Sequence, residues 1–258
     1  MDYPGCVWPV CILCCSGGLH NIVYAFGFGY GLSMAANGVM ASLNFDQTRF
    51  KSTSAIASRV GHICGYVAYG TRLFIYLYQR WGAASFSEKA ADIQERSDKM
   101  SLLAKASITL FVGTLMATYH FGLYFHVMKS NRRPSPVTWL GMTTWILGLV
   151  IETVADSQKM VAKAANPHRF VSTGLYKFCR HPNYFGEILF HIGMWLNGLP
   201  ACESYMQVAL SSIAPGMLTW VMIGASRRLD ASQMARYGNG AAFKAYIAKT
   251  PSIFPWIA

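Results

Sequence analysis

The sequence has few charged residues for its length. Asp, Glu, Lys and Arg make up only 13% of the 258 residues, whereas 53% of the residues are hydrophobic. A soluble globular domain usually carries about 25% charged residues. The deficit is too large for a surface that faces water on every side. It therefore predicts an integral membrane protein with several membrane-spanning segments.

Acidic residues are scarcer than basic ones. The chain has 22 Lys and Arg against 11 Asp and Glu, a formal net charge of +11. In a soluble protein this excess would suggest nucleic-acid binding. Here the basic residues lie in loops between apolar segments, where membrane topology requires them. A basic helix and interleaved basic and aromatic residues are both missing, so we expect no nucleic-acid partner.

Several common sequence motifs are also missing. The chain has no GxGxxG, no Walker A loop and no Gly-x-Ser-x-Gly, so a nucleotide cofactor would need side chains and loops outside a Rossmann domain. Cys11 and Cys14 have the C-x-x-C spacing, but no second pair or His cluster completes a zinc site. We expect no metal. Asp2 without a basic region argues against a cleaved signal peptide.

Long apolar stretches are present and predict an all-α fold. A spanning helix needs about 20 mostly apolar residues. We predict a polytopic transmembrane bundle of about six to seven spans that encloses a cofactor cavity open to the cytosol. Cys6–Leu43 is long enough for one tilted span or a cramped pair, and Ser16-Gly17-Gly18 could break it. The other expected spans are Val60–Gln79, Ala106–Met128, Val137–Ala155, Tyr184–Leu199 and Tyr205–Ala225.

The loops predict an orientation in the membrane. Loop 159–180 and the basic tail 227–258 lie on one side and together carry ten Lys and Arg, against three in loop 129–136. The positive-inside rule places the ten-charge side in the cytosol, and in a eukaryote the membrane would be the endoplasmic reticulum. We expect one domain over residues 1–258, and the family resemblance described below implies substrate-side helices in 1–136 and a cofactor-binding half in 137–258.

Charged residues inside the expected spans indicate a site. Intramembrane charge is costly and is usually functional, although a structural ion pair is the alternative. Helix neighbours recur every three or four residues, so polar residues fall on three faces. These faces are Tyr69, Arg72 and Tyr76; Glu152, Asp156, Lys159 and Lys163; and Asn183, Glu187 and His191.

Two segments carry a family resemblance. Arg180-His-Pro-Asn-Tyr-Phe-Gly-Glu187 resembles the signature of the DUF1295 membrane proteins, which are grouped with steroid 5α-reductases. Glu152-Thr-Val-Ala-Asp156-Ser-Gln-Lys159 is also typical of that group. The resemblance is strong over roughly residues 137–258. Arg-His-Pro alone is shared with membrane methyltransferases of the isoprenylcysteine carboxyl type.

The resemblance implies an NADPH site and a catalytic tyrosine. Asn183, Glu187 and Asp156 match residues that hold NADPH, Tyr246 matches a tyrosine before a C-terminal proline, and Arg227 or Arg228 matches an arginine of the tail. Tyr69 and Arg72 match a catalytic Tyr and the Arg that follows it. We expect the basic side chains to neutralise the cofactor phosphates. The expected cofactor-binding residues are Glu152, Asp156, Lys159, Lys163, Arg180, His181, Asn183, Tyr184, Glu187, Arg227 and Tyr246.

The first spans depart from the family pattern. Steroid reductases pair the catalytic Tyr with a Glu on the preceding helix, but no acidic residue lies between Cys6 and Leu43. Asp46, Asn21 and Asn37 are the polar candidates. The substrate of the expected reduction is therefore an enone C=C bond in a steroid or in another lipid. We expect membrane lipid around the protein and leave the oligomeric state open. A methyltransferase using S-adenosylmethionine and a non-catalytic scaffold are the alternatives.

Overall fold

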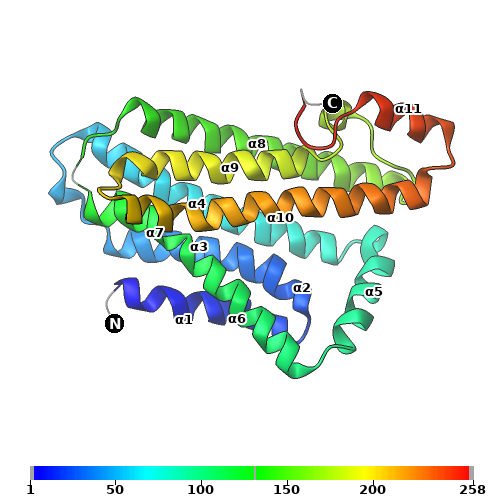
Figure 1. Ribbon diagram of the computed structural model, residues 1–258, viewed down its shortest axis with the longest axis horizontal. Coiled ribbons are helices and arrows are strands. Elements are labelled where there is room, and N and C mark those ends of the chain that lie inside the picture. Colours follow the sequence, from blue (N-terminus) through cyan, green and yellow to red (C-terminus); the bar gives the residue numbers. More distant parts are fainter. Residues whose placement is uncertain (1–2, 131, 256–258) are drawn as a thin grey trace. The chain divides into compact units, whose positions relative to one another are not determined.

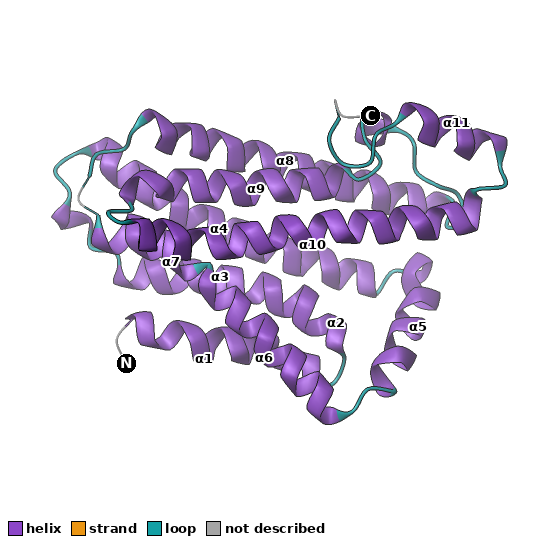
Figure 2. Cartoon of the chain, in the orientation of Figure 1, coloured by secondary structure: helices purple, strands orange, loops and turns teal. Residues whose placement is uncertain are grey.

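The computed structural model describes residues 3–130 and 132–255 (Figure 1). Helices make up 83% of the described residues, and Figure 2 shows helices and loops without a strand in these ranges. The helices are α1 Tyr3–Cys15, α2 Ile22–Tyr24, α3 Tyr30–Asn44, α4 Thr53–Trp81, α5 Ser87–Asp98, α6 Leu102–Thr118, α7 His120–Tyr124, α8 Pro136–Ala165, α9 Pro182–Gly198, α10 Tyr205–Tyr237 and α11 Ala241–Lys249. The predicted all-α fold class is confirmed.

Three helical stretches are long and apolar enough to cross a membrane. They are Leu102–Lys129, Pro136–Ala165 and Tyr205–Tyr237. The first consists of α6, α7 and the π-helical segment Phe125–Lys129. This finding agrees with a membrane protein, whereas the number of six to seven spans and the enclosed cavity stay predictions.

The long N-terminal apolar region is divided into separate helices. α1 ends at Cys15, and the 3₁₀ turn Ser16–Leu19 follows it. Asn21 then caps α2, because its side chain accepts a hydrogen bond from the backbone N–H of Val23. The break lies where the Ser-Gly-Gly sequence predicted it.

Two helices are longer than the sequence predicted. α8 continues to Ala165, so Lys159 and Lys163 lie on a helix and the loop begins at Asn166. α10 continues to Tyr237, so the expected tail begins as helix. The reason is local: Asn166-Pro167 and Gly238 are the first strong helix terminators after the apolar stretches. Charge alone does not end a helix.

The chain forms two compact units. The first unit comprises Met1–Thr143 and Gly193–Pro215, and the second comprises Thr144–Ile192 and Gly216–Ala258. In the first unit α1 packs against α3 and α6, and α3 packs along α4 (Figure 1). In the second unit Phe185, Ile188 and Ile253 form a buried core. The expected division into halves 1–136 and 137–258 stays a prediction.

Candidate functional site

The second unit buries three carboxylates on two adjacent helices. Glu152 and Asp156 of α8 are 2% and 3% exposed, and Glu187 of α9 is 8% exposed. Glycines let the two helices touch through their backbones: a Cβ atom on Gly186 would lie 2.6 Å from the backbone N of Glu152, and one on Gly148 would lie 2.3 Å from that of Phe190. Buried carboxylates need hydrogen-bond donors.

Asn183 adds an amide to the same face of α9. It lies four residues before Glu187, which is one helical turn, and His191 lies one further turn along. The Oδ1 atom of Asn183 is buried, and no donor within the described ranges reaches it. A buried acceptor without a donor is costly. An amide N–H or a hydroxyl group of a ligand would satisfy it.

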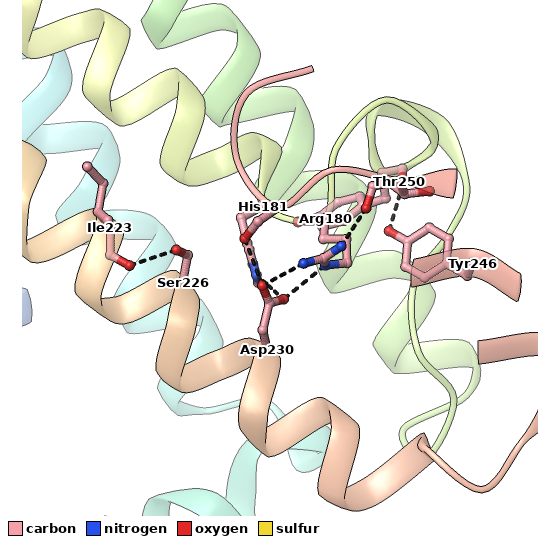
Figure 3. Close-up of polar contacts among 9 residues, drawn as sticks. Arg180, His181, Ile223, Ser226, Asp230, Tyr246 and Thr250 are labelled. Atoms are coloured by element: carbon pink, nitrogen blue, oxygen red, sulfur yellow. Dashed lines mark hydrogen bonds and ion pairs between the residues drawn. The ribbon is translucent and has the colours of Figure 1, made fainter. Parts of the chain in front are cut away.

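Asp230 of α10 joins the Arg180-His181 pair to the C-terminal segment (Figure 3). Its Oδ1 atom accepts from Arg180 Nε at 3.0 Å and lies 2.8 Å from His181 Nε2. Its Oδ2 atom accepts from Arg180 Nη2 at 2.8 Å and from the Ser252 hydroxyl at 2.7 Å. One carboxylate therefore holds three side chains from two other segments of the second unit.

The same two residues bind the C-terminal segment through their backbones. The N–H of Arg180 donates to Pro251 O and that of His181 to Ser252 O, both at 2.9 Å. Arg180 Nη1 also donates to Thr250 O. Three of the five N–H donors of Arg180 are thus used inside the protein. Burial lowers the pKa of His181, and the hydrogen bond to Asp230 offsets part of that effect.

Lys163 holds the loop that follows α8. Its ammonium group donates to Pro167 O at 2.9 Å, to Arg169 O at 2.7 Å and to the Tyr237 hydroxyl at 3.2 Å. An ammonium has three donors, so these bonds use its full capacity. The loop lines a pocket of about 530 Å³, together with the turn between α10 and α11. Its lining includes Asn166, His168, Arg169, Arg236, Asn239 and Phe243.

Tyr246 lies in an aromatic cluster beside this loop. Its ring stacks on Phe170 at 5.4 Å between centroids, and its hydroxyl donates to Tyr176 O at 2.8 Å. Burial raises the pKa of the Tyr246 phenol. The Tyr176 hydroxyl in turn donates to Ala155 O, next to Asp156. Tyr246 thereby connects α11 to α8.

The remaining expected cofactor residues also belong to the second unit. Tyr184 stacks on His181 with a centroid distance of 5.4 Å and an angle of 17°. Lys159 is half-buried on α8, on the face of Glu152 and Asp156, and Arg227 is exposed on α10. All eleven expected cofactor residues thus fall in one compact unit.

The expected catalytic residues belong to the first unit. Tyr69 of α4 is fully buried, and its hydroxyl lies 3.0 Å from that of Tyr30 on α3. The Arg72 guanidinium lies over the Tyr76 ring, 5.4 Å from its centroid. Tyr69, Arg72 and Tyr76 therefore share the predicted face of α4.

Sequence reasoning missed three residues of these clusters: Tyr30, Asp230 and Ser252. Asp230 carried a signal, because it is the only acidic residue in the basic tail 227–258. The sequence feature that could have pointed to Tyr30 is weaker: Tyr30-Gly31 and Tyr69-Gly70 are the same dipeptide. Ser252 carried none.

A metal site was not expected from the sequence. Across residues 3–130 and 132–255, no three His, Cys, Asp or Glu side chains are grouped to hold a metal ion. His62 and His126 do lie close together in the first unit, with their Nδ1 atoms 2.8 Å apart.

Comparison with known proteins identifies a family. The chain matches the model of DUF1295, described as a protein of unknown function, over residues 35–250. It therefore belongs to the DUF1295 family, as the sequence predicted. No curated protein matches the chain. No solved structure matches it either.

Proposed function

We propose that the protein is a membrane-embedded, NADPH-dependent oxidoreductase that reduces the C=C bond of an enone in a steroid or another lipid. The observation that carries this proposal is the buried Oδ1 atom of Asn183, an acceptor without a donor in the described ranges, one turn from the buried Glu187. The carboxamide of a nicotinamide is a donor that fits such a position.

The side chains of the second unit fit the remaining parts of the cofactor. Glu152 and Asp156 are buried acceptors suited to ribose hydroxyl groups. Lys159 and Arg227 offer positive charge for phosphates, and Arg169 and Arg236 add two guanidinium groups in the loop pocket. Arg180 and Lys163 would act differently from the sequence prediction, since both hold neighbouring segments in place. NADPH, when bound, supplies a hydride.

The proposed surroundings follow from the same reasoning. Three apolar helical stretches could cross a membrane, and a lipid-like substrate would reach the site through it. The basic loops would face the cytosol, where the cofactor is dissolved, and in a eukaryote the membrane would be the endoplasmic reticulum.

A thermal-shift experiment tests the cofactor. The protein purified in detergent should melt at a higher temperature with NADPH, because a ligand that binds only the folded state stabilises it. NADH should give a smaller shift, since it lacks the 2′-phosphate that the basic side chains would bind. A shift with S-adenosylmethionine and none with NADPH would favour the methyltransferase and overturn the proposal.

A further inference from the structure

The pocket of about 530 Å³ in the second unit is strongly basic. Arg169 lies on the loop after α8, and Arg236 lies in the last turn of α10. Both residues are exposed, and within residues 3–130 and 132–255 neither guanidinium group takes part in a hydrogen bond or an ion pair. The segments 157–186 and 231–258, which contain the whole lining, have no Asp or Glu in their sequence. The positive charge of the pocket is therefore available to an anionic ligand.

The N-terminus of α11 adds hydrogen-bond donors to the same pocket. The helix begins at Ala241, and its cap residue, Gly240, has no side chain that could accept a hydrogen bond. The first N–H groups of a helix have no partner within the helix, and the helix dipole adds partial positive charge there. Gly240 and Ala242 both line the pocket. Two guanidinium groups beside a helix N-terminus are suitable surroundings for a phosphate group.

Lys163 fixes the backbone positions from which the two arginines extend. Its ammonium group donates to Arg169 O and to the Tyr237 hydroxyl, and Tyr237 directly follows Arg236. The Phe170 ring also packs on the Tyr237 ring, with 5.8 Å between the centroids. The loop is thus held to the end of α10 by the protein itself. A site that is ordered in advance loses less entropy when a ligand binds.

The helices that carry the pocket place it near the membrane surface. α8 and α10 are two of the stretches that are long and apolar enough to cross a membrane. α8 has 30 residues and is therefore about 45 Å long, whereas a bilayer with its headgroups is about 40–45 Å thick. Val161 and Met234, near the ends of the two helices, are still 67% and 47% exposed. The pocket therefore lies at the level of the lipid headgroups, close to apolar side chains that suit lipid.

We propose that this pocket binds the headgroup of an anionic membrane lipid that carries a phosphate monoester. A phosphate monoester has a charge of about −1.5 to −2 and three acceptor oxygens. These match the two guanidinium groups and the N–H groups at the start of α11. A phosphodiester headgroup has one charge and two such oxygens, so it should bind less tightly. The expected orientation places the pocket in the cytosol, and the cytosolic leaflet is the anionic one.

The same guanidinium groups could instead serve the cofactor phosphates of the proposed function. The lipid site does not rest on that function, because it uses none of the buried acceptors on α8 and α9. In this assignment Lys159 and Arg227 remain for the cofactor phosphates. A soluble phosphate monoester has the same chemistry as the lipid headgroup, so the experiment compares a lipid, free phosphate and NADPH.

Binding of short-chain lipids to the protein purified in detergent tests the proposal. The probe is dioctanoyl phosphatidate, and the comparison ligands are dioctanoyl phosphatidylglycerol, inorganic phosphate and NADPH. Arg169→Gln and Arg236→Gln each remove one guanidinium group. Lys244→Gln is the matched control, because Lys244 is an exposed cation of α11 outside the pocket lining. Gly240→Asp places a carboxylate at the cap, where it should stabilise α11 and repel an anion.

We expect wild type to bind phosphatidate about fivefold or more tightly than phosphatidylglycerol. Arg169→Gln and Arg236→Gln should each weaken phosphatidate binding about 5- to 20-fold, since one basic residue near an anionic lipid contributes about that much. Lys244→Gln should bind as wild type does. Gly240→Asp should weaken binding about fivefold or more at an unchanged or higher Tm, so that its loss is not a loss of folding.

The outcomes separate the lipid site from its alternatives. Wild-type protein that does not bind phosphatidate, or equal losses in Lys244→Gln and the two arginine variants, would overturn the site. Inorganic phosphate that binds as tightly as phosphatidate would assign the pocket to a soluble anion and overturn the lipid assignment. NADPH that displaces phosphatidate, and that weakens equally in Arg169→Gln, would assign the pocket to the cofactor. Wild-type protein that binds phosphatidate but not NADPH would end the reductase proposal and support the lipid site.

Discussion

Replacing Asp230 by Asn should release the C-terminal segment of the second unit. The carboxylate accepts from Arg180 through two bonds, from Ser252 and from His181 (Figure 3). In Asp230→Asn, an NH₂ group replaces one carboxylate oxygen, so a hydrogen-bond donor points at the donors of Arg180, His181 or Ser252. Hydrogen bonds to charged groups contribute about 1.5–3 kcal/mol, and breaking a buried ion pair costs about 3–5 kcal/mol. The side chains of Arg180 and Asp230 are 17% and 25% exposed, so we expect a loss of about 2–4 kcal/mol.

Asp92→Asn provides the matched control. Asp92 pairs with Arg96 at 3.0 Å, but these side chains are 52% and 78% exposed, and exposed pairs contribute little. In detergent, Asp230→Asn should lower Tm by roughly 4–16 °C, and Asp92→Asn should not lower it measurably. Trypsin should also cut faster after Lys249, which directly precedes the anchored Thr250. Equal melting of the two variants, with unchanged cleavage at Lys249, would refute the anchoring role.

Three further substitutions test the second unit. Glu187→Gln should weaken NADPH binding roughly 5- to 150-fold, because an amide donor would replace a buried acceptor at a cost of about 1–3 kcal/mol; wild-type affinity in a folded variant would remove Glu187 from the cofactor face. Gly186→Ala should destabilise by about 1–3 kcal/mol or more, since its Cβ would lie 2.6 Å from Glu152 N. Gly216→Ala, whose Cβ meets nothing within 4 Å, should not destabilise, and equal melting of the two alanine variants would contradict the contact. His181 Nε2 lies 2.8 Å from Asp230 Oδ1, and the ring also interacts electrostatically with Lys159 and Arg180. Because the folded pKa of His181 lies below its ordinary value of 6.5, its stabilisation is present above pH 6.5 and is lost as the pH falls through the folded pKa. When thermal melts are recorded from pH 8 to pH 5, Tm should therefore fall more steeply in wild type than in His181→Gln. Parallel curves of Tm against pH for the two proteins would contradict this prediction.

The helices and their polar faces could be predicted because they depend on local sequence. Glu152 and Asp156 are four residues apart, as are Asn183 and Glu187, so helical periodicity alone places each pair on one face. The burial of Glu152, Asp156 and Glu187 in the second unit agrees with that reasoning. The ends of α8 and α10 were misjudged, because charged residues were taken as the start of a loop when only Pro and Gly terminate these helices.

The roles of Arg180 and Lys163 could not be predicted, because they depend on contacts between distant segments. A sequence shows that a guanidinium is available but does not show what it meets. Arg180 finds Asp230 fifty positions later, and Lys163 finds Tyr237 seventy-four positions later. Both residues were expected to neutralise the cofactor phosphates, and that expectation stays a prediction. Their hydrogen-bond partners indicate that they shape the surroundings of the proposed cofactor site.

The same physical device positions the polar residues in both units. Gly31 and Gly70 let α3 and α4 touch beside Tyr30 and Tyr69, and Gly186 lets α9 touch α8 beside Glu152. Small residues at helix contacts are the usual means of close packing in a membrane, where no hydrophobic effect drives apolar helices together. A polar side chain next to such a glycine is positioned by the contact between two helix backbones, which are more rigid than neighbouring side chains. The contact between α3 and α4 should therefore depend on Gly70, and Gly70→Ala should lower Tm in detergent, because its Cβ atom would lie 2.3 Å from the backbone N of Ala35.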